Sequence, residues 1–300
     1  MSPPLPLPLT VCIPVRNEAK NLPSCLAALG RDFEEIVVID SGSTDATRQI
    51  AEAAGASVLD FKWDGKFPKK RNWALRNHAF TTPWVLFVDA DEQVTPEFIA
   101  ELRRTLPDTK HDGFWLSFDN WFMGRPLRHG DTFRKLALFR IGSGEYERFP
   151  EDQWSHLDME VHEHPVLEGS TADISSRLQH HDYRGMKHYL AKHNEYSSWE
   201  ANRYHWLLKA GDDEWSKLNG RQRFKYRHLA AWWLGPFYFL MCFIAKRGFL
   251  DGPNGWTFAR LKMQYFSDIR LKIAEIAREH ASQGSGAPAP AANGSAALQG

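Results

Sequence analysis

The chain has 300 residues, with 37 Lys and Arg against 37 Asp and Glu, so its formal net charge at pH 7 is +0. The length is sufficient for one large domain or two smaller ones, and the balanced charge gives no support for bulk electrostatic binding of nucleic acid. The three cysteines, Cys12, Cys25 and Cys242, form no C-x-x-C pair and leave one unpaired, which favours a reducing compartment without a disulfide framework.

Residues 1–9 are mostly proline and leucine, without a basic start or a long apolar core. They do not have the pattern of a secretory signal peptide, so we expect the protein in the cytoplasm.

Four apolar segments in the first hundred residues predict strands, and a predicted helix follows each of them. The strands are expected at 9–15, 35–40, 56–61 and 84–88. The helices are expected at 21–29, from Ser43 or Thr44 as cap to 54, from 66 to just before 82, and from Thr95 as cap onward. This alternation predicts an α/β domain with a mostly parallel sheet whose polar strand ends gather at one edge.

Acidic residues follow the last of these strands directly, at Asp89 and Asp91. If the chain stays extended, both side chains point to the same side, where two carboxylates suit a hard divalent cation. Taken alone, D-x-D is short, and the acids could simply end a strand. The sequence contains neither G-x-G-x-x-G after the first strand nor G-x-x-x-x-G-K-[ST], so neither a dinucleotide site nor a P-loop is supported.

Four polar segments near the strand ends follow one another along the chain, Ile-Pro-Val-Arg-Asn-Glu at 13–18, Val-Ile-Asp-Ser-Gly-Ser-Thr-Asp at 38–45, Lys-Arg-Asn at 70–72 and Asp-Ala-Asp-Glu at 89–92. In that order they resemble the motifs of family 2 inverting glycosyltransferases. The resemblance implies a GT-A fold, a Rossmann-like, mostly parallel sheet flanked by helices, which binds a nucleotide-diphospho-sugar donor.

The resemblance also implies roles for single residues. Asp91 is expected to ligate Mg²⁺ or Mn²⁺ bridging the donor diphosphate, with Asp89 as a second ligand or a ribose contact. Lys69, Lys70 and Arg71 could donate to phosphate oxygens. The residues expected at the donor are Pro14, Val15, Arg16, Glu18, Asp40, Ser41, Gly42, Lys69, Arg71 and Asp89.

A segment rich in aromatic and basic residues, 120–130, lies between two further predicted strands at 114–118 and 135–140. Such a loop is expected to fold over a ligand or to pack on a neighbour. Its acceptor-site candidates are Trp121, Arg128 and His129.

An inverting transfer needs a general base that deprotonates the acceptor hydroxyl. The chain is similar to a subgroup resembling lipopolysaccharide-core glucosyltransferases, through Arg-His-Gly at 128–130, Leu-Phe-Arg at 138–140 and Val-His-Glu at 161–163. This resemblance implies Glu163 as base, with His162 orienting it or contacting metal or phosphate. Asp152 is the second choice, and an ordinary strand with outward polar residues is the alternative.

The histidines at 156, 162, 164, 180 and 181 raise the question of a zinc site. Their spacing matches no zinc pattern and no cysteine lies nearby, so we expect ordinary surface or loop histidines.

The C-terminal third is predicted to be helical from Met186. Residues 229–245 carry no charge and lie between basic flanks, but Gly235 and Pro236 interrupt them and they are shorter than the ~20 residues of a spanning helix. Basic flanks and Trp predict a segment that lies in the interface of an anionic leaflet, with a membrane span or a buried core helix as alternatives. The subgroup resemblance extends to Gly-Phe-Leu-Asp-Gly at 248–252.

The predicted organisation has four parts. These are a nucleotide-sugar-binding half at 1–110, an acceptor-binding half at 111–185, a helical membrane-associated extension at 186–280 and a disordered tail at 281–300.

The predicted function is metal-dependent, inverting transfer of a sugar to lipopolysaccharide core or a lipid-linked glycan. It would take place at the cytoplasmic face of the inner membrane, with the protein peripheral or monotopic. One alternative is transfer to a polyprenyl phosphate, with Arg125, Arg128 and Arg140 forming a basic pocket. Another is a catalytically inactive membrane-bound scaffold.

Overall fold

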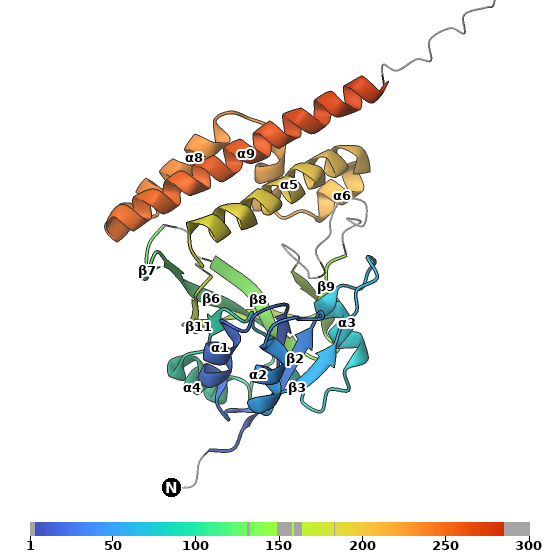
Figure 1. Ribbon diagram of the computed structural model, residues 1–300, viewed down its shortest axis with the longest axis vertical. Coiled ribbons are helices and arrows are strands. Elements are labelled where there is room, and N and C mark those ends of the chain that lie inside the picture. Colours follow the sequence, from blue (N-terminus) through green and yellow to red (C-terminus); the bar gives the residue numbers. More distant parts are fainter. Residues whose placement is uncertain (1–3, 131–132, 149–157, 159–163, 183, 285–300) are drawn as a thin grey trace, which may run out of the picture. The chain divides into compact units, whose positions relative to one another are not determined.

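The computed structural model describes residues 4–130, 133–148, 158, 164–182 and 184–284 (Figure 1). The chain forms two compact units, each made of two segments. The first contains Met1–Ala191 and Tyr238–Leu261, and the second contains Lys192–Phe237 and Lys262–Gly300. Residues 238–261, expected in the helical extension, therefore group with the sheet.

The first unit is an α/β unit built on one large sheet. Within the described residues the strands follow the order β3-β2-β1-β4-β8-β6-β11-β5, and β7 pairs with β6. Their bounds are β1 Leu7–Val15, β2 Phe33–Asp40, β3 Ser57–Asp60, β4 Trp84–Phe87, β5 Glu92–Gln93, β6 Gly113–Phe122, β7 Arg125–Leu127, β8 Phe133–Arg140 and β11 Thr171–His180. A separate antiparallel pair consists of β9 Gly144–Tyr146 and β10 Pro165–Leu167.

The first four strands are parallel, as predicted, because a helix connects each one to the next. The later strands are mixed: β8 runs antiparallel to both β4 and β6, while β11 is parallel to β6. The helices among the first four strands are α1 Leu22–Leu29, α2 Thr47–Ala53, α3 Lys70–Asn77 and, after β5, α4 Pro96–Thr105. The carboxyl ends of β1, β2 and β4 therefore meet at one edge.

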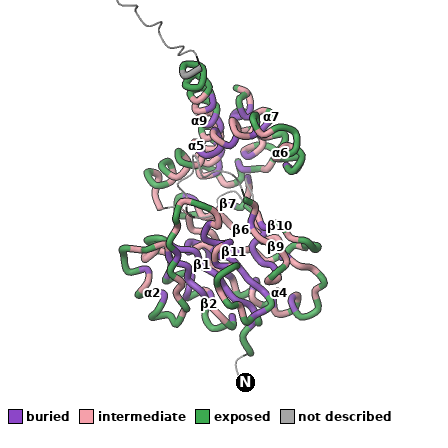
Figure 2. The backbone as a smooth tube through the Cα atoms, turned by 90° about the vertical axis from the view of Figure 1, so that its right-hand side faces the viewer, coloured by how far each residue is buried: buried purple, intermediate pink, exposed green. Residues whose placement is uncertain are grey.

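The apolar strand β4 is buried on both faces, as its sequence predicts. Trp84 and Leu86 belong to one hydrophobic cluster, whereas Val85 and Phe87 belong to a second one. Successive side chains of a strand point to opposite faces, so the two clusters cover the two sides of the sheet. Figure 2 shows the same buried character along β1 and β2.

Helix starts were predicted with mixed success. The Thr95 side chain accepts from the N–H of Phe98 at 3.2 Å, which confirms it as the cap of α4. The predicted cap of α2 was wrong, because the helix begins at Thr47. Ser43 instead donates to Asp40, and the N–H of Thr44 donates to Asn17, so both residues belong to the loop after β2, which bonds to the segment after β1.

The segment predicted as a loop at 120–130 is largely a hairpin. Strand β6 continues to Phe122, and β7 returns against it after a tight turn. Met123 and Gly124 have φ angles of 50° and 79°. Two consecutive residues with positive φ give the turn whose twist matches antiparallel strands.

The rest of the chain is helical. Its elements are α5 Met186–Ala210, α6 Asp212–Lys217, α7 Gly220–His228, α8 Leu234–Leu240, a π-helix Met241–Ala245, a 3₁₀-helix Gly248–Asp251 and α9 Gly252–Gly284. Among the described helices, none combines the length and the apolar character needed to cross a bilayer. Helix α9 continues past the predicted start of disorder at 281, and residues 285–300 lie outside the described residues.

The second unit has a buried polar centre. Glu200 is 3% exposed and accepts from Lys225 Nζ and Tyr226 Oη, both at 2.8 Å. The guanidinium of Arg203 lies over the Tyr226 ring at 5.1 Å. Burial is the main cause that raises the pKa of Tyr226, and the Glu200 charge adds to it. A buried carboxylate paired in this way fixes α5 against α7.

Candidate metal and donor site

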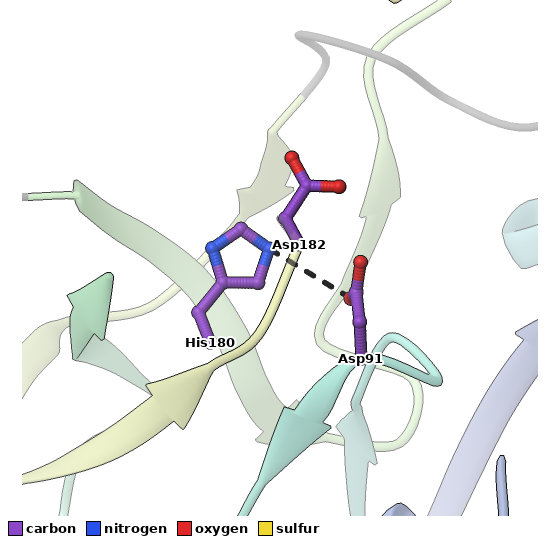
Figure 3. A group of neighbouring side chains, drawn as sticks. All are labelled: Asp91, His180 and Asp182. Carbon is purple, nitrogen blue, oxygen red and sulfur yellow. Dashed lines mark ion pairs between the residues drawn. The ribbon is translucent and has the colours of Figure 1, made fainter. Parts of the chain in front are cut away.

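Among the described residues, Asp91, His180 and Asp182 form a group that could hold a metal ion, and we call them the metal group. Their ligand atoms all lie within 4.8 Å of one another (Figure 3). Asp91 precedes β5, whereas His180 and Asp182 come from the end of β11 and the residues after it. The short strand β5 joins the two segments, because Glu92 pairs with His180 and the N–H of His181 donates to the carbonyl of Asp91 at 2.7 Å.

The ring of His180 is fixed from several sides. Its Nδ1 lies 2.9 Å from Asn120 Oδ1, and the ring stacks on Phe133. If Nδ1 donates to this amide oxygen, Nε2 is the ring atom left to bind a metal. Nε2 lies 3.7 Å from Asp91 Oδ1, so the imidazole faces the carboxylate. Two carboxylates with one imidazole suit Mn²⁺, and Mg²⁺ less well.

His180 and Asp182 were not predicted as ligands; His180 was expected to be an ordinary surface or loop histidine, and it lies at the end of β11 within reach of Asp91 and Asp182. In the sequence, these two ligands could have been recognised only as a histidine and an acid at the end of the strand that became β11. Their partner, however, lies about ninety residues earlier, and only the pairing of β5 with β11 brings them together. His181 stacks on Trp121 with ring centroids 4.9 Å apart, which places that acceptor candidate next to the metal group.

Asp89 lies outside the metal group and is held by two cations. Arg71 Nη2 donates to its Oδ1 at 2.7 Å, and Lys135 Nζ donates to its Oδ2 at 3.1 Å. Strand β4 ends at Phe87 and the chain turns at Ala90, with the N–H of Glu92 donating to the carbonyl of Asp89. The assumption of an extended chain was therefore wrong, and the two acids have different surroundings.

Asp89, Glu92 and Lys135 shift one another's pKa values. Burial by itself raises the pKa of Asp89, but Lys135 and Arg71 outweigh it and hold that pKa well below its ordinary value. Burial raises the pKa of Glu92 to about 7, although Lys135 opposes the shift. Burial lowers the pKa of Lys135, but Asp89 and Glu92 reverse this, so the net shift is upward. Neither Glu92 nor Lys135 was predicted as a site residue.

We expect Lys135→Met to lower the free energy of unfolding by about 3–5 kcal/mol, because it leaves the buried Glu92 without its cation and the half-buried Asp89 with Arg71 alone. Urea denaturation measures the change. The matched control is Arg134→Met on the same strand, whose partner Asp173 is 66% exposed, and it should cost less than about 1 kcal/mol. Equal losses for the two variants would contradict the role of Lys135.

The remaining cations at the start of α3 also have protein partners. Lys70 Nζ donates to the carbonyl of Val15 at 3.0 Å and lies 3.4 Å from a carboxylate oxygen of Asp158. Lys69 is buried at 5% exposure. Together with the Arg71 ion pair, these contacts show how α3 is held against the ends of β1 and β4.

Polar atoms at the ends of β1 and β2 form the predicted donor side. Asp40 is buried, and its Oδ1 accepts from the N–H and the Oγ of Ser43 at 2.9 and 2.6 Å. Ser41 Oγ is a buried hydroxyl with no hydrogen-bond partner in the described part of the chain. Gly42 follows with a φ of 76° and is exposed. An unsatisfied buried hydroxyl beside a carboxylate fits a polar ligand at this edge.

The other donor candidates differ in their surroundings. Pro14 and Val15 are buried within β1, and Arg16 is exposed. Glu18 accepts a double contact from Arg184 Nη2, at 2.6 and 2.7 Å. Burial lowers the pKa of Arg184, but the bond to Glu18 outweighs this and raises it. Arg184 was not predicted, and its ion pair ties the end of β1 to the segment after β11.

The acceptor candidates Arg128 and His129 are held by Asp251. Their backbone N–H groups donate to its carboxylate at 3.2 and 2.9 Å, and His129 Nδ1 lies 3.1 Å from Asp251 Oδ1. The predicted base Glu163, its partner His162 and the alternative Asp152 lie outside the described residues.

Three comparisons describe what the chain resembles. The profile of the family described as Glycosyl transferase family 2 matches residues 10–161. The lipopolysaccharide core biosynthesis glycosyltransferase LpsC of Rhizobium meliloti is 28% identical over 297 residues, which covers 92% of this chain and 94% of LpsC. A TPR repeat-containing protein of Synechococcus elongatus is 42% identical over 98 residues, but this chain covers only 24% of its length.

Two solved structures are also similar. Staphylococcus aureus TarS, residues 1–349, is 16% identical with 92% of both chains covered and a TM-score of 0.44. Glucosyl-3-phosphoglycerate synthase of Mycobacterium tuberculosis, in complex with Mn²⁺, UDP and glucosyl-3-phosphoglycerate, is 23% identical over 39% of this chain and 44% of its own, with a TM-score of 0.29. TM-scores this low carry no weight for the conclusions below.

Proposed function

Because this chain belongs to glycosyl transferase family 2 and is a glycosyltransferase, we propose that it transfers a sugar from a nucleotide-diphospho-sugar to a membrane-associated glycan, with inversion at the anomeric carbon. One observation supports this above the others. The metal group lies at the carboxyl edge of the sheet, the same edge at which Asp40 and Ser41 end β2. Ligands of open α/β sheets bind at this edge.

The described residues would bind the cation and the donor in three groups. Asp91, His180 and Asp182 would hold the cation, which when bound takes up the negative charge of the leaving diphosphate. Arg71 and Lys135 keep Asp89 ionised and oriented beside the metal group. The free hydroxyl of Ser41 and the carboxylate of Asp40 offer polar contacts to the nucleoside.

Glu163 remains the proposed general base, with His162 as its orienter and Asp152 as the second choice. The support is the order of the Arg-His-Gly, Leu-Phe-Arg and Val-His-Glu segments in the sequence. A carboxylate base takes the proton of the acceptor hydroxyl as the hydroxyl oxygen bonds to the anomeric carbon and the bond to the diphosphate breaks. The sugar is then joined to the acceptor with inverted configuration.

The proposed acceptor is lipopolysaccharide core or a lipid-linked glycan at the cytoplasmic face of the inner membrane. The similarity to LpsC, which extends over nearly the whole length of both chains, supports this choice. A polyprenyl phosphate acceptor receives less support. Arg140, one of its three expected basic residues, lies over Trp84 and donates to the carbonyls of Thr109 and His111, so it is already engaged at the opposite edge of the sheet.

A thermal-shift measurement with nucleotide sugars, with and without Mn²⁺, tests the proposal. At about one hundred times Kd we expect the matching donor to raise Tm by about 5 °C or more, and only with metal present. His180→Ala should abolish the part of the shift that depends on metal. His111→Ala, at the opposite edge, is the control and should keep it. An equal rise in Tm without metal would contradict the assignment of the metal group. In a separate assay of donor hydrolysis with Mn²⁺, the absence of hydrolysis with every donor would favour the inactive scaffold.

A further inference from the structure

Five large apolar side chains are exposed around the turn between α8 and α9, and we call them the apolar turn. They are Leu240, Ile244, Phe249, Leu250 and Trp256, each between 46% and 56% exposed. All of them belong to the segment Tyr238–Leu261 of the first unit. An exposed apolar group of this size on a soluble surface usually marks a contact with a partner or a membrane.

Two members of the apolar turn meet at one aromatic side chain. The ring of Phe243 lies 5.2 Å from that of Trp256 and 6.3 Å from that of Phe249. Leu240 and Ile244 are one helical turn apart, and Leu250 follows Phe249 in the 3₁₀-helix. The five exposed side chains therefore come from one short stretch of chain in which Phe243 links the 3₁₀-helix to α9.

The turn is held in a defined position by the sheet. The carboxylate of Asp251 binds two backbone N–H groups of the segment after β7, and the N–H of Gly130 donates to the carbonyl of Lys246 at 2.9 Å. Asn254 Nδ2 donates to the carbonyl of Phe122 at 3.0 Å, at the end of β6. A Cβ at Gly255 would lie 1.9 Å from the carbonyl oxygen of Gly248, so the two backbones are in close contact. The apolar side chains are thus exposed on a fixed framework.

The charge on this surface is positive. Arg247 and Arg260 are exposed. The one acid of the segment 238–261, Asp251, accepts hydrogen bonds from the backbone N–H groups of Arg128 and His129. The guanidinium of Arg247 has no partner in the part of the chain that the structure describes, and its backbone has a φ of 57°. This left-handed conformation is unfavourable for arginine, and such strain tends to occur at functional positions.

We propose that the apolar turn inserts into the headgroup boundary of an anionic bilayer, with Arg247 at the lipid phosphates. Exposed aromatic and aliphatic side chains beside unpaired cations suit this interface. The inference deepens the proposed function by naming the surface that contacts the membrane, and it moves the centre of contact from the predicted 229–245 to 240–256. Strand β6 carries both Asn120, which orients His180, and Phe122, which binds Asn254, so the bilayer contact and the metal group share one strand.

Co-sedimentation of the full chain with lipid vesicles tests the inference. Wild type should bind vesicles of mixed phosphatidylglycerol and phosphatidylcholine more tightly than vesicles of phosphatidylcholine alone. Phe249→Ser combined with Leu250→Ser should weaken binding by about tenfold or more. Val166→Ser, which changes another exposed apolar side chain of the first unit, should bind as wild type does. Wild-type binding by the double variant would overturn the proposal, as would equal binding to both kinds of vesicle.

Arg247→Gly gives an independent check that does not depend on a destabilised variant. Glycine suits the positive φ, so Tm should stay the same or rise, while binding to the anionic vesicles should fall by about fivefold. Unchanged binding would overturn the role of Arg247. Hydrolysis of the sugar donor in solution, measured with Mn²⁺ and without vesicles, should be equal in all these variants. Absence of that hydrolysis in wild type would count against the proposed function, and the vesicle result would still test the surface.

Discussion

Replacing Asp91 with Asn is expected to lower the turnover of sugar transfer by about a thousandfold or more, which corresponds to about 4 kcal/mol of transition-state stabilisation. The amide keeps the shape of the side chain but removes the charge that attracts the cation. Asp91 is 9% exposed. It directly precedes β5, whose pairing with β11 brings it close to His180 and Asp182. Without the Asp91 carboxylate, His180 and Asp182 would bind the cation weakly. The negative charge on the leaving diphosphate would then not be neutralised by a metal ion.

Initial rates over a series of Mn²⁺ concentrations measure this effect. We expect the residual activity of Asp91→Asn to need a higher metal concentration than wild type. Asp173→Asn is the matched control, because it makes the same change at an exposed acid on β11 that pairs with Arg134, and it should keep nearly full turnover. Turnover of Asp91→Asn within tenfold of wild type at saturating metal would count against the assignment.

Replacing Glu163 with Gln is expected to lower turnover by about a hundredfold to ten thousandfold, the usual contribution of a general base. The donor should still bind with its normal affinity, because the base acts on the acceptor hydroxyl. Thermal shift with the donor and Mn²⁺ measures binding, and single-turnover transfer to the acceptor measures the chemical step.

Asp152→Asn, the corresponding change at the second candidate, separates the two choices. If Glu163 is the base, Asp152→Asn should affect turnover by less than about tenfold. The reverse pattern would move the role to Asp152. If Glu163→Gln lost donor binding with little effect on the chemical step, the residue would belong to the donor site and not to the base.

Local sequence was a good guide where burial and turn chemistry act within a few residues. The run at 84–88 predicted a strand buried on both faces, and β4 packs into two separate clusters. Thr95 followed by Pro96 predicted the start of α4, and the Thr95 side chain caps it. In both cases the residues that decide the structure are neighbours in the chain.

Features that depend on partners far along the chain could not be predicted in this way. Asp89 and Asp91 were expected to point to the same side, but Lys135, forty-six residues away, binds Asp89, and His180 faces Asp91. Ser43 was expected to cap a helix, but Asp40 and the N–H of Asn17 bind it. A polar side chain that can bond in several ways takes the partner that the fold brings to it.

The two-residue strand β5 has a consequence for the order in which the protein is assembled. When the first hundred residues have left the ribosome, the strands β1 to β4 can pair and Asp40 and Ser41 are in place. The metal group is still incomplete, because His180 ends β11 and Asp182 follows it, and both depend on the pairing of Glu92 with His180. Contacts of such long sequence separation carry a large cost in loop closure. The nascent chain therefore has all three residues of the metal group together only after β11 has paired with β5.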